Sequence, residues 1–555
     1  MTKISLRLHH PIMFTLITLL SACGGGGSTS SPIVFSSPNT PTVEVPSTTL
    51  PLVNVSTVSK NDPGSSLSDN WRNGPFMEIY VRGYQDSNGD GVGDIRGLIQ
   101  RLDYLQDLGI KGIWLMPITQ SEDKDHGYAV KDYRDIETQY GTLADFDELV
   151  KQAHARGIGL ILDYVMNHSA TTHPAFINSA DTSNNAYRAW YVWKDIAPSG
   201  WTIFGNNPWY NTKNGAYFAA FYSGMPDFNL LNPAVLEFHQ NNLRFWLNRG
   251  ADGFRFDAVG NLVENNAGAW ESQPESIALM GKVRENIAQY DKRFIVCEAP
   301  SKPLAFAAND SCGNAFAFQH NYNIVNAAKA QSSAIQAVAD YFKTAPLTMS
   351  TMISNHDEFA GARLWDQVNG NIAQYKLAAA TYLLQPGTPF IYYGEEIGLA
   401  GAANLTGDHK LRTPMSWNSN SINAGFSTGT PFRALSGNAS SQNVEAQRQD
   451  PNSLLQFYKD LISLRKQRNS LNSGNYSNAA VNGSVLSFHR QFGDEKSVVL
   501  INYGNNSITT NIKNLPINTT LSSVYPNKIV KVNSDTSGSA DVNLPAQSFF
   551  VFSIN

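Results

Sequence analysis

The sequence contains little cysteine, no excess of basic residues and no apolar run long enough to cross a membrane. With only 3 cysteines in 555 residues, a disulfide-rich scaffold is excluded. Beyond residue 23 only Cys297 and Cys312 remain; they could form a disulfide in an exported protein or could be free buried thiols. Lys and Arg number 41 against 46 Asp and Glu, and no basic stripe is present, so nucleic acid is not an expected partner.

The beginning of the chain is typical of a bacterial export signal. Two basic residues precede a short apolar run at 11–20, and Leu20-Ser-Ala-Cys23 follows. This tetrapeptide resembles the lipobox of bacterial lipoproteins, which implies a signal peptide at 1–22 and a lipid on Cys23. The alternative is an ordinary signal peptide with an incidental cysteine. Gly24, rather than Asp, favours the outer membrane of a Gram-negative bacterium by the same resemblance.

Residues 23–70 are predicted to be a flexible tether. Gly, Ser, Thr, Pro and Val dominate this stretch and charge is sparse, so it cannot bury enough apolar surface to fold. Such a tether would hold a folded body away from the membrane. The 42% of hydrophobic residues is typical of a globular protein. A chain of 555 residues is too long for one simple core and predicts roughly two to four domains.

Short apolar runs alternate with helical patterns from about residue 71. Near-continuous apolar strands separated by helices predict a parallel sheet buried on both faces. Eight such units predict an α/β fold, a (β/α)₈ TIM barrel, which we assign to residues 71–167 and 230–470. Its strands are expected at Met77–Arg82, Gly112–Pro117, Ile158–Val165, Gly253–Val259, Arg293–Ala299, Asn314–Phe318, Thr348–Ser354 and Phe390–Tyr393.

Two further domains are expected. Residues 168–229 follow the third strand, lack a clear strand–helix unit and are rich in aromatics; because a structureless loop of that length is improbable, we predict a small inserted domain. Residues 471–555 alternate apolar and polar positions, which predicts a C-terminal antiparallel β-sandwich.

Carboxylates stand at the ends of the predicted barrel strands. Asp163 ends the third strand, Asp257 lies on the fourth, Glu298 ends the fifth and Asp357 follows the seventh. These acids should converge, because TIM-barrel active sites form at the C-terminal ends of the strands. Arg255 points to the same face as Asp257 and would keep it ionised. A carboxylate beside a protonated acid suits glycoside hydrolysis, although any one acid alone could simply cap a helix.

Five segments carry a family resemblance. They are Asp163-Tyr-Val-Met-Asn-His168, Met225-Pro-Asp-Phe-Asn229, Gly253-Phe-Arg-Phe-Asp-Ala-Val259, Val296-Cys-Glu-Ala299 and Ile353-Ser-Asn-His-Asp357. With these segments the chain resembles the α-amylase family, glycoside hydrolase family 13, from about residue 76 to the C-terminus. Four of them fall in the family's order at strand ends, which makes the resemblance specific.

The resemblance implies roles for individual residues. Asp257 would be the nucleophile that forms a covalent glycosyl-enzyme, and Glu298 would be the general acid and then the base. Asp357 would bind sugar hydroxyls and stabilise the distorted ring, whereas Asp163 would be a support residue. Sugar contacts are implied for Asp125, Tyr128, His168, Arg255, His356 and Arg412.

The stretch Asp86-Ser-Asn-Gly-Asp-Gly-Val-Gly-Asp94 predicts a structural Ca²⁺ site. Oxygen ligands at alternating positions, with glycines that permit a tight turn, suit a hard cation. The stretch differs from an EF-hand loop at the twelfth position, which is Gly97, and it resembles the calcium loop after the first barrel strand of many family members. The expected ligands are Asp86, Asn88, Asp90, the Val92 carbonyl and Asp94. The alternative is a glycine-rich turn without metal.

The expected activity is hydrolysis of α-1,4-glucosidic bonds in starch, glycogen or maltooligosaccharides. Ala258 follows the expected nucleophile, where related enzymes acting on α-1,6 bonds often carry Val. Asp125 and the segment Arg412–Trp417 resemble exo-acting relatives, so an exo-acting α-glucosidase, maltogenic amylase or transglucosidase is the alternative.

Non-enzymatic alternatives also exist for this family. Some of its barrels are non-catalytic partners of transporters, and a tethered starch-binding protein is conceivable. Both are expected to lack the catalytic acids, and Asp257, Glu298 and Asp357 are all present. The expected partners are therefore an α-glucan substrate and a membrane reached through the lipid on Cys23, with the protein itself a monomer.

Overall fold

The computed structural model describes residues 50–181, 185–526 and 530–554. The chain divides into two units at residue 49, and the described residues belong to the second. The predicted signal peptide, Cys23 and residues 23–49 of the predicted tether lie outside the described residues, so those expectations stay predictions. Among the described helices, none has the length and apolar character needed to span a bilayer.

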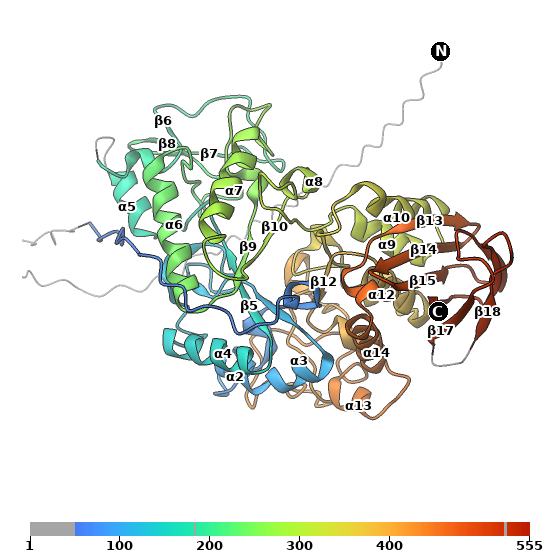
Figure 1. The fold of residues 1–555 in the computed structure, drawn as a ribbon. Helices are drawn as coiled ribbons and strands as arrows, with labels where there is room; N and C mark the ends of the chain where they lie inside the picture. The colour runs from blue at the N-terminus through green and yellow to red at the C-terminus, as the bar shows by residue number, and fades with distance from the viewer. Residues whose placement is uncertain (1–49, 182–184, 527–529, 555) are drawn as a thin grey trace, which may run out of the picture. The chain divides into compact units, whose positions relative to one another are not determined.

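Seven parallel strands form the central sheet in the order β10-β9-β5-β2-β1-β12-β11 (Figure 1). The sheet closes through single bridges from Cys297 to Ala315 and from Phe316 to Ser350, so residues 314–318 occupy the sixth barrel position between β10 and β11. The predicted barrel is confirmed. Its strands are β1 (Phe76–Ile79), β2 (Gly112–Leu115), β5 (Gly159–Tyr164), β9 (Gly253–Phe256), β10 (Phe294–Cys297), β11 (Ser350–Thr351) and β12 (Thr388–Tyr392).

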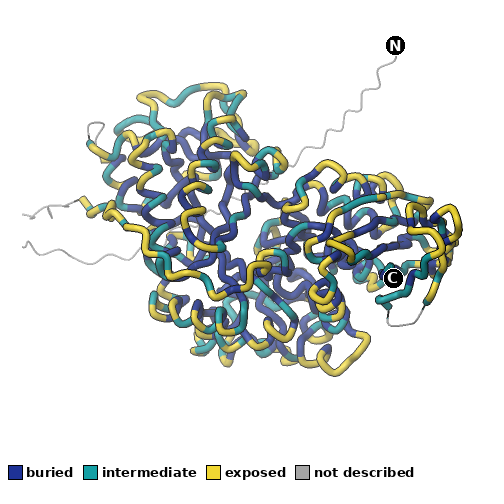
Figure 2. The backbone as a smooth tube through the Cα atoms, viewed as in Figure 1, coloured by how far each residue is buried: buried dark blue, intermediate teal, exposed yellow. Residues whose placement is uncertain are grey.

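Amphipathic helices connect these strands and cover the barrel. Local sequence sets their ends: Thr142 and Asp145 form a reciprocal capping box at the start of α4, and Gly109 adopts a left-handed conformation after α3. The main helices are α2 (Ile95–Gln100), α3 (Leu102–Leu108), α4 (Leu143–Ala155), α6 (Pro233–Asn248), α7 (Pro274–Ile287), α9 (His320–Ala328), α10 (Ser332–Thr344), α12 (Ile372–Leu384) and α14 (Leu454–Gln467). Figure 2 shows dark blue, buried backbone in the interior and yellow, exposed segments mainly at the periphery.

Residues 50–70 lie against the barrel without forming helix or strand. The Val58 amide donates to Asn241 Oδ1 of α6 at 2.8 Å, and Asp62 pairs with Arg293 at 3.0 Å. The folded body therefore begins at residue 50, not near residue 71, and the described part of the predicted tether belongs to it. A polar, strand-free segment can be ordered in this way when other elements satisfy its backbone groups.

The insertion after β5 is a small β-domain. It contains α5 (Pro174–Asp181) and a three-stranded sheet of β6 (Trp193–Lys194), β8 (Gly215–Phe218) and β7 (Trp209–Thr212). Its buried core includes Ile203, Trp209 and Phe218, so part of the aromatic enrichment is packing. Asp227 returns the chain to the barrel, where its Oδ2 accepts a hydrogen bond from Asn167 Nδ2 at 3.0 Å.

The C-terminal strands form a six-stranded antiparallel sheet and a two-stranded ladder. The order of the large sheet is β13-β14-β15-β20-β17-β18, and β16 (Ile508–Ile512) pairs with β19 (Ala540–Leu544). Alternation along β15 (Glu495–Asn502) places Val498 in the core shared with this ladder and Val499 in the core shared with the barrel helices. The remaining strands are β13 (Ser477–Asn482), β14 (Val485–Phe492), β17 (Thr520–Tyr525), β18 (Lys531–Asn533) and β20 (Ser548–Ile554).

Candidate active site

Three carboxylates meet at the C-terminal ends of the barrel strands. Asp257 follows β9, and its amide donates to Tyr164 O at 3.1 Å; Glu298 follows β10, and its amide donates to Phe256 O at 3.0 Å. The parallel hydrogen-bond register thus continues one residue past each strand and presents both side chains at the same end. Asp357 lies in the turn after β11.

Arg255 joins these acids to Asp163. Its Nη1 lies 2.7 Å from both Asp163 Oδ1 and Asp257 Oδ1, and its Nη2 lies 2.8 Å from Glu298 Oε2. The guanidinium is fully buried; its Nη1 donates hydrogen bonds to Asp163 and Asp257, whereas its Nη2 contacts Glu298 as an ion pair. The amide of Ala258, which has a strained left-handed φ of 45°, also donates to Glu298 Oε2 at 2.9 Å.

Electrostatic effects give the two central acids, Asp257 and Glu298, different pKa values. Burial raises the pKa of Asp257 to about 6, against the lowering effect of Arg255. Burial raises the pKa of Glu298 to about 7, again against Arg255, while the charges of Asp257 and Asp357 raise it further. A carboxylate beside a carboxylic acid near neutral pH is the state that glycoside hydrolysis requires.

Asp357 is kept ionised by two cations. Its Oδ2 lies 3.0 Å from His356 Nε2, and its Oδ1 lies 2.8 Å from Arg412 Nη2. Burial opposes ionisation, but these neighbours lower the pKa of Asp357 well below its usual range. This acid is therefore suited to accepting hydrogen bonds from substrate hydroxyls rather than to donating a proton.

Tyr128 connects Asp163 to His356. Its hydroxyl lies 2.9 Å from Asp163 Oδ2 and 2.7 Å from His356 Nε2. Trp114 Nε1 donates to the same Asp163 oxygen at 3.1 Å. Asp163 is thus engaged on both oxygens by protein donors, which agrees with a support role rather than a chemical one.

Asp125 anchors one wall of the site. Its Oδ1 accepts hydrogen bonds from Tyr80 Oη and Arg433 Nη2, each at 2.6 Å, and its Oδ2 lies 3.6 Å from Arg412 Nη1. Burial opposes ionisation, but these partners lower the pKa of Asp125 to about 2. Arg412 therefore bridges Asp125 and Asp357.

His168 lies at the site's edge toward the inserted domain. Its ring is buried and lies 5.2 Å from that of Phe221, and its Nε2 is without a hydrogen-bond partner among the described residues. Burial lowers the pKa of His168 to about 3, so the ring is neutral.

Sequence reasoning missed residues that complete the site. Arg433 belongs to no motif, and a contact with Asp125 across 308 residues leaves no local signal. Glu78 was detectable, because a charged residue in the middle of a strand buried on both faces is unusual. It lies 2.5 Å from His356 Nδ1. The sequence-predicted residues Asp125, Tyr128, Arg255, His356 and Arg412 all join the three acids through the contacts above.

The predicted calcium loop turns tightly through Gly89 and Gly91, both with positive φ. Asn88 Oδ1, Asp90 Oδ1 and Asp94 Oδ2 each accept one backbone hydrogen bond, which orients these oxygens and leaves each a second lone pair. Asp86, the first predicted ligand, has both oxygens engaged by protein donors: Oδ1 accepts from the amides of Asn88 and Gly89, and Oδ2 from the amide of Gly91 and from Ser427 Oγ. Over residues 50–181, 185–526 and 530–554, no three His, Cys, Asp or Glu side chains form a metal-binding group, so calcium stays a prediction.

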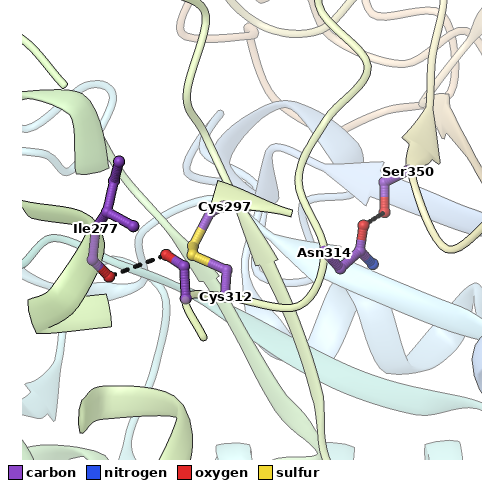
Figure 3. The surroundings of a disulfide bond; sticks show 6 residues. Ile277, Cys297, Cys312, Asn314 and Ser350 are labelled. Carbon is purple, nitrogen blue, oxygen red and sulfur yellow. Dashed lines mark hydrogen bonds between the residues drawn. A yellow bond between two sulfur atoms is a disulfide. The ribbon is translucent and has the colours of Figure 1, made fainter. Parts of the chain in front are cut away.

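Cys297 and Cys312 form a disulfide, which answers the question that the sequence left open (Figure 3). Cys297 immediately precedes Glu298, and both half-cystines are buried. Beside the bridge, Ser311 Oγ donates to Ile277 O at 3.0 Å. The disulfide therefore ties the strand that presents Glu298 to the segment leading into the sixth barrel position.

Replacing Cys312 with Ser is expected to destabilise the protein by about 3 kcal/mol, because the bridge closes a loop with a sequence separation of 15. Denaturant unfolding of the variant and the parent, each with and without reductant, measures this cost. Reductant should destabilise only the parent. Equal stability of the two oxidised proteins would contradict the prediction.

Comparisons with known proteins agree with this geometry. The family model described as "Alpha amylase, catalytic domain" matches residues 78–474. The chain is 34% identical over 460 residues to alpha-amylase 3 of Dictyoglomus thermophilum, covering 80% of this chain and 87% of that protein. It is 30% identical over 508 residues to an oligo-1,6-glucosidase of Parageobacillus thermoglucosidasius, covering 78% and 90%. A solved trehalulose synthase from Pseudomonas mesoacidophila aligns with a TM-score of 0.75 at 25% identity, covering 87% and 99%.

A barrel that presents an ionised and a protonated carboxyl from neighbouring strands defines a glycosidase. The relatives narrow this class: the chain belongs to the α-amylase family of glycoside hydrolases, family 13.

Proposed function

We propose that this protein hydrolyses α-1,4-glucosidic bonds of starch or maltooligosaccharides with retention of anomeric configuration. The observation that carries the proposal is the single Arg255 guanidinium, which holds oxygens of Asp257 and Glu298 at 2.7 and 2.8 Å. One guanidinium bridging both carboxyls supports the short separation of about 5–5.5 Å used by retaining enzymes, rather than the 6.5–9.5 Å of inverting ones.

In this proposal each acid has one task. Asp257, ionised beside Arg255, attacks the anomeric carbon, while Glu298 gives its proton to the departing glycosidic oxygen. Glu298, now a carboxylate, then takes a proton from water, which cleaves the covalent ester and frees the sugar. Ala258 beside the nucleophile and the similarity to an alpha-amylase support α-1,4 specificity.

The stereochemistry of the first product tests the mechanism. Hydrolysis of maltoheptaose, followed by proton NMR from the first minutes, should show new α-anomeric reducing ends before mutarotation produces the β form. Early β-anomer would reject retention. Rates on maltotriose and isomaltotriose, measured side by side, test the linkage; faster cleavage of isomaltotriose would reject the α-1,4 assignment.

A second candidate is exo action by an α-glucosidase or a transglucosidase. It is favoured by the wall in which Arg412 bridges Asp125 and Asp357, because such a wall would stop the glucan one sugar beyond the cleavage point. Similarity to an oligo-1,6-glucosidase and a trehalulose synthase adds support. Unlabelled glucose and labelled maltohexaose as the early products from maltoheptaose labelled at its reducing end would indicate exo action; a mixture of labelled oligosaccharides would indicate an endo-acting amylase.

We also propose that the 86–94 loop binds a structural Ca²⁺. Removing the ion with a chelator is expected to lower the free energy of unfolding by about 2–3 kcal/mol, as for a ligand supplied near 100 times its Kd. Thermal unfolding with calcium and with chelator measures this. Asp90→Ser should lose the response, and an identical melting temperature of the parent in both buffers would contradict the proposal.

A further inference from the structure

The side chain of His356 lies between two carboxylates. Its Nδ1 is 2.5 Å from Glu78 Oε1 on β1, and its Nε2 is 3.0 Å from Asp357 Oδ2. His356 is 0% exposed and Glu78 is 1% exposed, so solvent screens neither contact. Asp357 is suited to binding sugar hydroxyls, but Glu78, a fully buried acid, has no role in the reaction proposed above.

The hydrogen bonds of Tyr128 decide where one proton of the imidazole lies. Tyr128 has a single hydroxyl hydrogen, and Asp163 Oδ2, which lies 2.9 Å away, can accept it. Asp163 cannot donate in return while Arg255 keeps it ionised. The 2.7 Å contact between Tyr128 Oη and His356 Nε2 therefore requires that Nε2 carries a hydrogen.

The second ring nitrogen then depends on Glu78. If Glu78 is ionised, Nδ1 must also carry a hydrogen, because a carboxylate only accepts. We propose that Glu78 is a positioning residue that keeps His356 a doubly protonated cation, so that a fixed positive charge faces Asp357 at the sugar-binding end of the site. This inference rests on the proposed function.

Burial raises the pKa of Glu78, but the neighbouring charges of His356 and Arg255 oppose that rise and favour an ion pair. Burial opposes protonation, but the carboxylates of Asp357 and Glu78 raise the pKa of His356 to about 10. The other groups facing the ring are Tyr128 and Trp114, and the cations of Arg255 and Arg412 lie beyond Tyr128 and Asp357 respectively. Glu78 supplies the negative charge beside Nδ1, whereas Asp163 reaches the ring through Tyr128.

Glu78→Gln removes this charge and keeps the shape. A glutamine amide can donate to an unprotonated Nδ1, so the ring can remain in place while it becomes neutral. We expect kcat on maltotriose to fall roughly 10- to 100-fold at pH 8 and much less at pH 5.5, with KM nearly unchanged. The profile of the variant should gain a second ionisation on its alkaline side, that of His356, in addition to that of Glu298.

Three variants separate charge from packing. Glu78→Asp restores a carboxylate with a shorter reach and should recover part of the parent profile. Glu396→Gln changes another fully buried acid, which accepts from Tyr104 Oη at 2.7 Å outside the site, and should leave the profile unchanged. Thermal unfolding of all three confirms that each variant is folded.

A spectroscopic measurement is independent of turnover. The ring nitrogens of His356 can be observed by NMR with ¹⁵N-labelled histidine, and their signals are identified by their loss in His356→Asn. At pH 8.5 these signals should keep the imidazolium shift in the parent. In Glu78→Gln they should show a neutral ring. An unchanged imidazolium signal and an unchanged pH profile in Glu78→Gln would overturn the inference. If the parent itself fails to cleave maltooligosaccharides, the proposed function fails, while the NMR comparison still decides the role of Glu78.

Discussion

Replacing Asp257 with Gly is expected to reduce hydrolysis of maltooligosaccharides by at least roughly 10⁴-fold, since no other group can form the covalent intermediate. The fold should survive, because Arg255 remains paired with Asp163 at 2.7 Å and with Glu298 at 2.8 Å. Initial rates on maltotriose and a thermal unfolding curve measure both effects.

Added azide gives this variant a positive signature. The space vacated by Asp257 lies on the face from which the nucleophile attacks, so azide with α-glucosyl fluoride should yield β-glucosyl azide. The product anomer is read by NMR. An α-azide product, or a variant that still hydrolyses maltotriose at the parental rate, would show that Asp257 is not the nucleophile.

Replacing Glu298 with Gln is expected to lower kcat/KM on maltotriose by about 10²–10⁴-fold, the usual contribution of a general acid. The loss should be much smaller on an aryl α-glucoside whose leaving group needs no proton. With Glu298→Ala, azide should attack the glycosyl-enzyme from the opposite face and yield α-glucosyl azide. The β-azide expected from Asp257→Gly and the α-azide expected from Glu298→Ala therefore serve as controls for each other.

The Glu298→Gln variant should also change the pH dependence of the rate, and only on the alkaline side. Catalysis needs Asp257 ionised, and its pKa of about 6 makes the rate rise with pH on the acid side. It also needs Glu298 protonated, and its pKa of about 7 makes the rate fall above neutrality. Glu298→Gln should therefore lose the alkaline limb and keep the acid limb; a variant that retains the alkaline limb would assign that limb to another group.

Much of the barrel could be predicted because its strands are buried on both faces and so form unbroken apolar runs in the sequence. Even the weak run at 314–318 was located, although only single bridges tie it to its neighbours. The Cys297–Cys312 disulfide holds the connection between β10 and this run. The sequence left this disulfide open because its formation depends on the distance between the two Cα atoms, which is 6.3 Å in the structure.

Residues 50–70 could not be placed from composition. Their sequence is polar and poor in core-forming residues, which is also the signature of a tether. They are ordered by burial of Leu67 in a core cluster with Trp71 and by distant side chains that satisfy their backbone groups, such as Asn241 Oδ1, which accepts from Val58 N. A pattern within the segment contains no information about acceptors that lie on α6.

The amino-acid sequence by itself determined the barrel, the inserted and C-terminal domains and the identity of the acids, since periodicity and strand ends are local properties of the chain. Only the tertiary structure gave the contacts that set the pKa values of these acids and showed that Glu78 contacts His356 across 278 residues. The physical reason is that pKa values depend on burial and on charges a few ångströms away, and both arise only when separate segments are packed together.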